Sequence, residues 1–202
     1  MQHLIIFARH PELGRVKTRL AADIGAEAAL AIYRQLLAHT RAVVAPLAVH
    51  KTVWLAETAH APEQAADWPG YEQLPQPPGD LGQKMQMAFD HDLARGATKV
   101  VIIGTDCPGL TTEHLTEAFA ALDTHDVVLG PAADGGYYLL GLKQLHAELF
   151  RNKPWSTATV RTETEADAAR LHLHLHRLPE LTDIDTGADL RAWQLASGQT
   201  LG

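Results

Sequence analysis

Short apolar runs rich in β-branched residues alternate along the chain with longer stretches of helical periodicity. The short runs predict strands at residues 4–8, 52–56, 99–103, 127–130 and 137–142. The longer stretches carry apolar residues on one helical face and predict helices over 26–45, 81–95 and 112–122. Strands that alternate with helices are typical of an α/β domain built on a mostly parallel sheet.

Two segments refine this expected sheet. The run VVII at residues 100–103 is apolar at every position, which is typical of a parallel strand buried on both faces, so we expect it near the centre of the sheet. The run DGG at residues 134–136 lies between two apolar runs and is a typical hairpin signal. The sequence therefore predicts a mixed sheet with an antiparallel pair added to parallel strands.

Length and composition limit the classes of protein to consider. The 202 residues, 46% of them hydrophobic, suffice for one domain with a substantial core, so we expect a single domain over residues 1–202. The 17 basic and 24 acidic residues give a net charge of −7, which disfavours nucleic acid and anionic membranes as partners. A single cysteine, Cys107, excludes an intrachain disulfide and a Cys-rich zinc site. Residues 4–8 are too few for a membrane span or a signal peptide, so we expect a cytoplasmic protein.

Positive charge gathers in one loop, residues 9–19, directly after the first predicted strand. Four basic residues and one glutamate give this loop a charge of 4 − 1 = +3. Because ligands bind at the carboxyl ends of strands in open α/β sheets, we expect a di- or triphosphate here, bound by Gly14, Arg15, Lys17 and Arg19. The competing interpretation is a solvated loop whose arginines pair with nearby acids.

Several well-known motifs are absent. The loop contains neither G-x-x-x-x-G-K-[ST] nor G-x-G-x-x-G, which argues against a P-loop and a standard dinucleotide fold. Neither Ser156 nor Ser197 lies in G-x-S-x-G, so serine hydrolase chemistry is also disfavoured.

Three aspartates are candidate metal ligands. Asp106 follows the most apolar strand, where its carboxylate would face the same crevice as the basic loop. Asp183 and Asp185 share one side of an extended backbone and would complete an oxygen site with it. The competing roles are a turn residue or helix cap for Asp106 and a helix cap for Asp185 or Thr186. We assign Thr186 and Asp189 to a capping box.

Three further features have more than one interpretation. Cys107 is more consistent with a small buried hydrophobe than with a nucleophile. His172, His174 and His176 alternate with leucines, which suggests either a transition-metal site or, as we favour, the polar face of an outer strand. Asp134 is either a turn former or a general base at the hairpin tip.

Six motifs in order, from Phe7 to Asp189, closely resemble those of a bacterial family. The family, once a domain of unknown function, is now usually labelled glycosyltransferase A-like or radical-SAM/selenodomain-associated transferase. The motifs are F-A-R-x-P-x-x-G-x-V-K-T-R-L (7–20), G-D-L-G-Q-K-M (79–85), G-T-D-C-P-G-L (104–110), G-P-A-x-D-G-G-Y-Y-L-L-G-L (130–142), W-S-T (155–157) and D-I-D-T (183–186).

The resemblance implies a nucleotide-diphospho-sugar transferase fold (GT-A, Rossmann-like): a three-layer sandwich with a mostly parallel mixed sheet between helices. Molybdenum-cofactor and phospholactate nucleotidyltransferases share this fold. By the same resemblance a divalent cation, Mg²⁺ or Mn²⁺, is bound by Asp106 and by Asp183 or Asp185. The nucleotide is bound by Ala8, Arg9, Gly14, Arg15, Lys17, Arg19 and a base-reading segment from Gln76 to Gly82.

We therefore expect glycosyl transfer from a nucleotide sugar to a small acceptor. Arg15 and Lys17 would stabilise the departing nucleotide, and Asp134 would be the acceptor-side base. The expected sugar pocket contains Tyr137, Trp155, Ser156 and Thr157. Nucleotidyl transfer from a nucleoside triphosphate, with release of pyrophosphate, is the second hypothesis. It is less favoured because the nucleotidyltransferase loop has several glycines, of which only Gly14 is present. A nucleotide-binding module without turnover is the third.

Overall fold

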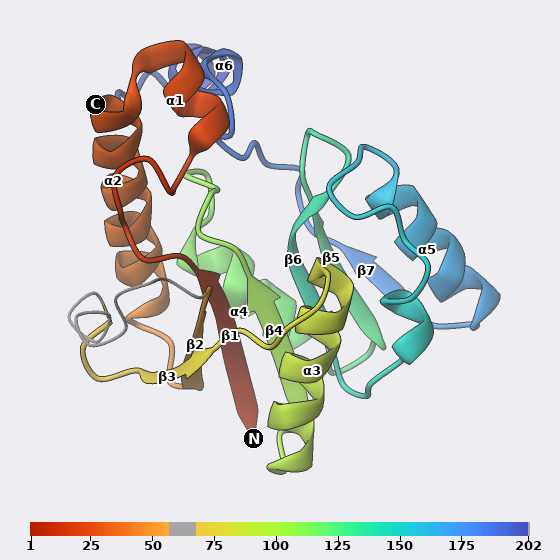
Figure 1. The fold of residues 1–202 in the computed structure, drawn as a ribbon. Helices are drawn as coiled ribbons and strands as arrows, with labels where there is room; N and C mark the ends of the chain where they lie inside the picture. Colours follow the sequence, from red (N-terminus) through yellow and green to blue (C-terminus); the bar gives the residue numbers. More distant parts are fainter. Residues whose placement is uncertain (57–67, 202) are drawn as a thin grey trace.

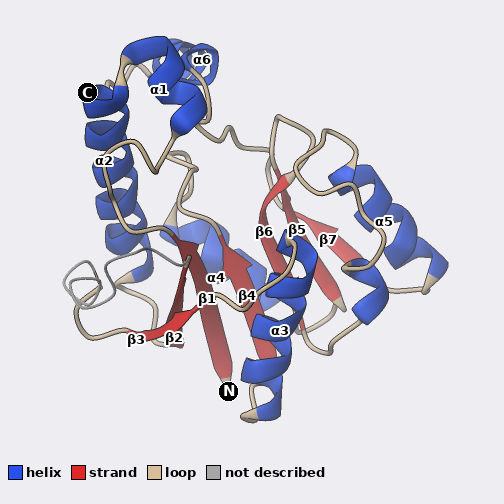
Figure 2. Ribbon diagram, viewed as in Figure 1, coloured by secondary structure: helices blue, strands red, loops and turns tan. Residues whose placement is uncertain are grey.

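The computed structural model describes residues 1–56 and 68–201, and within them one mixed sheet of seven strands is covered by helices (Figures 1 and 2). The strands are β1 (Gln2–Ala8), β2 (His50–Leu55), β3 (Glu72–Pro75), β4 (Lys99–Ile103), β5 (Val127–Pro131), β6 (Tyr137–Leu142) and β7 (Leu175–Arg177). The helices are α1 (Thr18–Ile24), α2 (Ala26–Val44), α3 (Leu81–Ala94), α4 (Thr112–Ala121), α5 (Val160–Arg170) and α6 (Gly187–Ser197), with a 3₁₀ turn η2 (Ala147–Leu149).

The strand order confirms the predicted mixed sheet. It runs β3-β2-β1-β4-β6-β5-β7, so the apolar strand β4 is the middle strand, as expected for a strand buried on both faces. Strands β3, β2, β1 and β4 pair in parallel. Strand β6 is antiparallel to both β4 and β5, which confirms the hairpin predicted at residues 134–136, and β7 is parallel to β5.

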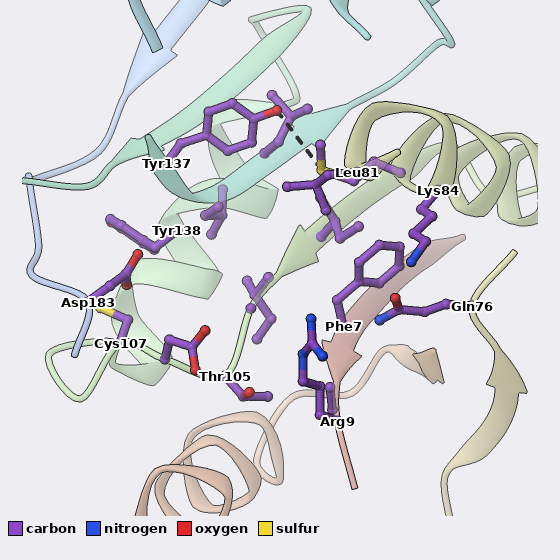
Figure 3. Close-up of a pocket in the computed structure, with 18 of the residues that line it drawn as sticks. Phe7, Arg9, Gln76, Leu81, Lys84, Thr105, Cys107, Tyr137, Tyr138 and Asp183 are labelled. Carbon is purple, nitrogen blue, oxygen red and sulfur yellow. Dashed lines mark hydrogen bonds between the residues drawn. The ribbon is translucent and has the colours of Figure 1, made fainter. Parts of the chain in front are cut away.

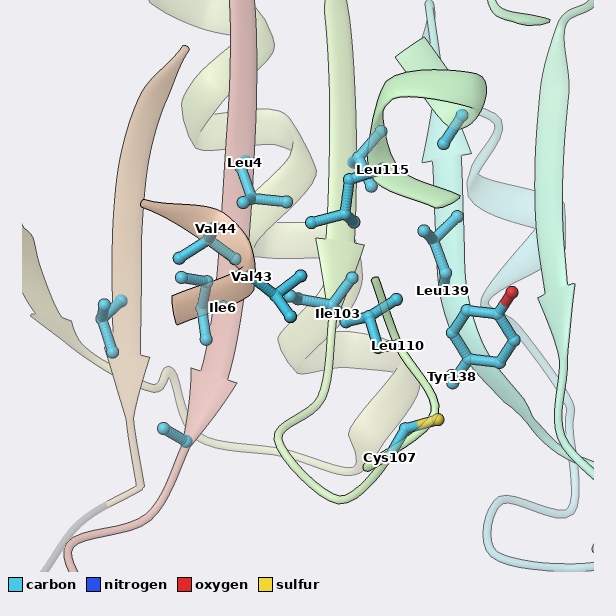
Figure 4. Close-up of a cluster of buried hydrophobic side chains, with 14 of the residues drawn as sticks. Leu4, Ile6, Val43, Val44, Ile103, Cys107, Leu110, Leu115, Tyr138 and Leu139 are labelled. Atoms are coloured by element: carbon cyan, nitrogen blue, oxygen red, sulfur yellow. The ribbon is translucent and has the colours of Figure 1, made fainter. Parts of the chain in front are cut away.

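Alternate residues of the central strands feed cores on opposite faces of the sheet. Leu4 and Ile6 of β1 pack in one cluster with Leu115 of α4 and residues of α2, as Figure 4 shows for part of this cluster. Ile5 turns to the other face and packs in a cluster with Phe89 of α3. Helices on both faces confirm the expected three-layer sandwich, and Figure 1 shows α3 and α5 in front of the sheet.

Two sequence interpretations near the carboxyl terminus have different outcomes. The predicted capping box is confirmed, because the Thr186 side chain accepts from the Asp189 amide at 3.2 Å and Asp189 accepts from the Thr186 amide at 2.7 Å. The three-histidine strand face is wrong, because β7 spans only three residues and His172 lies before it with φ 56°. The leucines at positions 171, 173 and 175 nevertheless pack against the core, as expected of an outer strand.

The lengths and apolar content of the helices also bear on membrane association. Within residues 1–56 and 68–201, no helix is long and apolar enough to cross a membrane.

Candidate functional site

Two adjoining hollows lie where β1 and β4 end. The first, called here the strand-end hollow, measures about 400 Å³ and is lined by the ends of β1 and β4 and the start of β6. The second, called the loop hollow, measures about 550 Å³ and is lined by residues 15–19 of the basic loop, by the hairpin tip and by residues 155–157. The lining residues they share are Arg9, Tyr33, Leu81, Asp106, Tyr137, Ser156 and Asp183.

Most of the residues that the sequence singled out line these hollows. Those in the strand-end hollow are Ala8, Arg9, Gln76, Asp106, Tyr137, Ser156 and Asp183. Those in the loop hollow are Arg9, Arg15, Lys17, Arg19, Asp106, Asp134, Tyr137, Trp155, Ser156, Thr157, Asp183 and Asp185. Gly14 and Gly82 line neither. Gly14 forms a turn with φ 75°, and Gly82 lies beneath Trp155, where a Cβ would come within 2.5 Å of the indole ring.

The start of the basic loop is tied to α2 by a tyrosine. The hydroxyl of Tyr33 accepts a hydrogen bond from the Arg9 amide at 2.9 Å and donates one to the Arg9 carbonyl at 3.0 Å. Burial raises the pKa of this hydroxyl, so it stays protonated and can keep donating. The sequence predicted the helix over 26–45 that carries Tyr33 but gave the tyrosine no separate role. The missed signal is that a buried tyrosine hydroxyl needs a polar partner.

Lys17 joins the basic loop to two of the candidate metal ligands. Its Nζ lies 2.6 Å from Oδ1 of Asp106 and 2.9 Å from Oδ1 of Asp185, and its side chain is only 5% exposed. Burial acts to lower the pKa of Lys17, but the two carboxylates outweigh it and the net pKa is raised. The backbone of Lys17 is left-handed, with φ 49°, a conformation that costs an L residue about 1–2 kcal/mol.

The structure brings the three predicted aspartates together. Besides the Lys17 contacts, the Ile184 amide donates to the Asp106 carbonyl at 2.9 Å, which fixes the 183–185 segment to the end of β4. Burial raises the pKa of Asp183 to about 7, and the carboxylates of Asp106, Asp134 and Asp185 add to the shift. The other carboxylates therefore lie close enough to Asp183 to disfavour a further negative charge on it.

The donor set fits a hard divalent cation. In the described part of the chain no three His, Cys, Asp or Glu side chains already form a metal-binding group. Two carboxylates do converge on one point, where the ammonium of Lys17 lies. Mg²⁺ needs only one or two protein carboxylates, because waters and substrate phosphates complete its shell.

Cys107 and Asp134 take the structural roles considered for them. Cys107 is buried, and burial raises the pKa of its thiol, which disfavours the thiolate and agrees with a packing role. Oδ1 of Asp134 accepts from the Gly136 amide at 2.8 Å, which confirms the turn. Asp134 is also exposed at the loop hollow, so its role as a base stays a prediction.

Three lining residues, Phe7, Lys84 and Thr105, were not predicted, and a fourth, Leu81, lies inside the base-reading segment predicted from Gln76 to Gly82. Phe7, Leu81, Lys84 and Thr105 all line the strand-end hollow (Figure 3). Leu81 and Lys84 lie three residues apart at the start of α3, so one turn of helix brings both to the same side. The phenol of Tyr137 lies across the hollow, with its hydroxyl 4.0 Å from the sulfur of Met85.

The family of the chain follows from comparison with known proteins. Residues 29–157 match the model of a family described as "Uncharacterized protein conserved in bacteria (DUF2064)". The chain belongs to this family. A crystal structure from Desulfovibrio desulfuricans G20, provisionally named a nucleotide-diphospho-sugar transferase, is 30% identical, with a TM-score of 0.92 over 97% of this chain and 87% of that one. A search of curated proteins found no match.

More distant structures share the fold. The 4-diphosphocytidyl-2C-methyl-D-erythritol synthase of Anaerococcus prevotii DSM 20548 is 11% identical, with a TM-score of 0.65 over 98% of this chain and 96% of that one. Glucosyl-3-phosphoglycerate synthase of Mycobacterium tuberculosis, solved with Mn²⁺, UDP and glucosyl-3-phosphoglycerate, is 14% identical, with a TM-score of 0.52 over 90% of this chain and 70% of that one. At these identities, the two structures show only that the chain shares their fold.

Proposed function

We propose that this family member transfers a glycosyl group from a nucleoside-diphosphate sugar to a small acceptor. The observation that supports the proposal is the mixed charge of the loop hollow. Arg15, Lys17 and Arg19 line it together with Asp106, Asp183 and Asp185. A diphosphate needs basic side chains, and carboxylates beside it are useful only if a cation bridges them to the phosphates.

The strand-end hollow would take the nucleoside. Its volume of about 400 Å³ lies within the range of small-molecule sites. Phe7 offers a ring face, while Arg9, Gln76 and Lys84 offer polar groups. The amide nitrogen of Gln76 donates to the Trp54 carbonyl at 3.1 Å, and this bond orients the side chain before a ligand arrives.

The diphosphate would lie in the loop hollow, where the glycosidic bond to the departing nucleotide breaks. Arg15 is 61% exposed, with Nε 3.2 Å from Glu12 Oε1, so it can turn toward a phosphate at little desolvation cost. Arg19 is exposed on the same side. Both guanidinium groups would stabilise the negative charge that develops on the leaving diphosphate. A divalent cation, held by Asp106 with Asp183 or Asp185, would add Lewis-acid stabilisation of the same charge.

The acceptor would enter beside the hairpin tip. Asp134 is the candidate base that takes the proton of the acceptor hydroxyl as its oxygen attacks the anomeric carbon. Tyr137 and Trp155 would pack against the sugar, and Ser156 and Thr157 would offer it hydroxyl groups. The provisional name of the Desulfovibrio relative, and the UDP and Mn²⁺ bound to the mycobacterial one, support this assignment.

A panel of nucleotide sugars tests the proposal. Single-turnover reactions with Mg²⁺ or Mn²⁺ and a mixture of small hydroxyl compounds are followed by release of the nucleoside diphosphate. We expect one donor to react and Asp106→Asn to slow it about 100-fold or more, as for other losses of transition-state charge stabilisation. Asp123→Asn is the control, because Asp123 is exposed and pairs with Lys99 outside both hollows.

Three outcomes would overturn the proposal. An undiminished rate in Asp106→Asn would exclude the assigned role of the carboxylates. Release of pyrophosphate from nucleoside triphosphates, with no reaction of nucleotide sugars, would identify nucleotidyl transfer. Tight nucleotide binding with no product from either panel would identify a binding module.

A further inference from the structure

One ammonium group occupies the point on which two candidate metal ligands converge. The Lys17 Nζ contacts the Oδ1 atoms of both Asp106 and Asp185, at 2.6 and 2.9 Å. A Mg²⁺ ion at about 2.0–2.1 Å from the same two oxygens would lie close to the position of this nitrogen. The ammonium and a divalent cation therefore exclude one another from these oxygens.

The surroundings of Lys17 suggest what would move it. The side chain is only 5% exposed, yet the two carboxylates are each 43% exposed, so they can be reached from the loop hollow. Lys17 itself lines that hollow beside Arg15 and Arg19. A phosphate bound there would offer the ammonium a second anionic partner, and the flexible four-carbon stem of lysine lets the ammonium change partners.

We propose that Lys17 holds the place of the divalent cation in the ligand-free protein and exchanges its carboxylate partners for phosphate when a diphosphate and a cation bind. The inference rests on the proposed function for the identity of the diphosphate. It goes further by giving Lys17 two successive partners. Lys17 thus weakens cation binding until phosphate is present.

The exchange couples the two ligands. Without phosphate, a cation must displace Lys17 and leave a poorly solvated ammonium without a partner. With phosphate, the displaced ammonium gains a new partner, so the cation binds more tightly. Linkage requires that the cation strengthen phosphate binding by the same factor. Removal of the ammonium should abolish most of this coupling.

Two measurements with Mn²⁺ alone test the first half of the exchange, in which the cation competes with the Lys17 ammonium for the two carboxylates. In the first, Mn²⁺ is titrated by electron paramagnetic resonance into the wild type, Lys17→Met and Lys153→Met. Lys153 is a matched control, because it is 2% exposed and paired with Asp167 at 2.5 Å, away from both hollows. We expect Lys17→Met to bind Mn²⁺ at least about 10-fold more tightly than the wild type, which corresponds to about 1.4 kcal/mol. Lys153→Met should bind it like the wild type.

The second measurement uses the unaltered protein, so it stays decisive if Lys17→Met does not fold. Amine acetylation is followed by mass spectrometry at Lys17 and Lys153, at constant pH, with and without saturating Mn²⁺. We expect Mn²⁺ to accelerate acetylation of Lys17 and to leave that of Lys153 unchanged, because only the Lys17 ammonium is displaced. Unchanged Mn²⁺ affinity in Lys17→Met, or unchanged acetylation of Lys17, would overturn the proposal.

Neither measurement requires turnover, so the two proposals fail separately. A protein that shows the exchange but reacts with no nucleotide sugar refutes the proposed function alone. A protein that transfers a sugar while Mn²⁺ leaves Lys17 unreactive refutes the exchange alone.

Discussion

Gly135 holds the hairpin tip against the segment that carries Trp155, and its substitution by alanine should loosen both. Gly135 has φ 90°, and a Cβ there would lie 2.1 Å from the Ala158 carbonyl oxygen and 2.6 Å from the Ala158 Cα. The Gly135 carbonyl also accepts from the Arg161 amide at 3.0 Å. Because the overlapping atoms belong to backbone, a rotamer change cannot relieve the overlap, and residues 155–159 must shift.

The expected cost of Gly135→Ala has three parts. The positive φ costs an L residue about 1–2 kcal/mol. The lower entropy of the unfolded chain offsets about 0.4–1 kcal/mol of it. The overlap with Ala158 adds about 1–3 kcal/mol, the usual cost of overpacking. The limits of the three parts sum to about 1–5 kcal/mol, and their central values give an expected loss of about 3 kcal/mol in the free energy of unfolding.

Gly96→Ala is the matched control for this prediction. Gly96 has φ 88°, and a Cβ added there would meet no heavy atom within 4 Å, so this variant bears the backbone cost without the overlap. Urea unfolding should show a loss of only about 1 kcal/mol for it. Equal losses in the free energy of unfolding for Gly135→Ala and Gly96→Ala would refute the argument that Ala158 leaves no room for a side chain at position 135. Under the proposed function, Gly135→Ala should also weaken nucleotide-sugar binding, while Gly96→Ala should not.

Three further predictions concern the rest of the fold. Asp80 caps helix α3, because its Oδ1 accepts from the Gln83 amide at 2.8 Å. Asp80→Ala removes this cap and should lower the free energy of unfolding by about 1 kcal/mol, whereas Asp80→Asn keeps a capping oxygen and should lower it much less. Phe89→Ala empties a fully buried site and should cost about 3–5 kcal/mol by urea unfolding; a loss below about 1 kcal/mol would contradict the assigned packing. Burial lowers the pKa of His3, and this effect outweighs that of Asp92, which lies 3.3 Å away and raises the pKa. The folded state therefore favours the neutral imidazole. The contribution of His3 to the free energy of unfolding is fully present above its unfolded pKa of about 6.5, and it is lost as the pH falls through the lower pKa of the folded state. When the pH is lowered from about 8 to about 5.5, the wild type should therefore lose more free energy of unfolding than His3→Gln does. Equal losses in the two proteins would contradict this reasoning.

The sequence predicted those elements that bury a regular apolar face. Strand β4 was predicted because it is apolar at every position from 100 to 103, and helix α2 because its apolar positions repeat with the period of a helix. Strand β3 was not predicted, because it has four half-buried or exposed residues and ends in a proline. Helix α5 was not predicted, because its buried positions include Thr164 and Ala168, which give little apolar contrast.

The sequence by itself determined which segments gather at the site. Asp106 and the basic loop each follow a strand, and the ends of parallel strands meet at one edge of a sheet whatever the side chains do. Only the tertiary structure decided which charged groups contact one another. Lys17 and Asp185 are 168 residues apart, and their contact depends on a left-handed turn at Lys17 and on the fixing of Ile184 to β4. Charge and spacing along a chain carry no information about such contacts, because an ammonium selects among several carboxylates by distances and burial that exist only after folding.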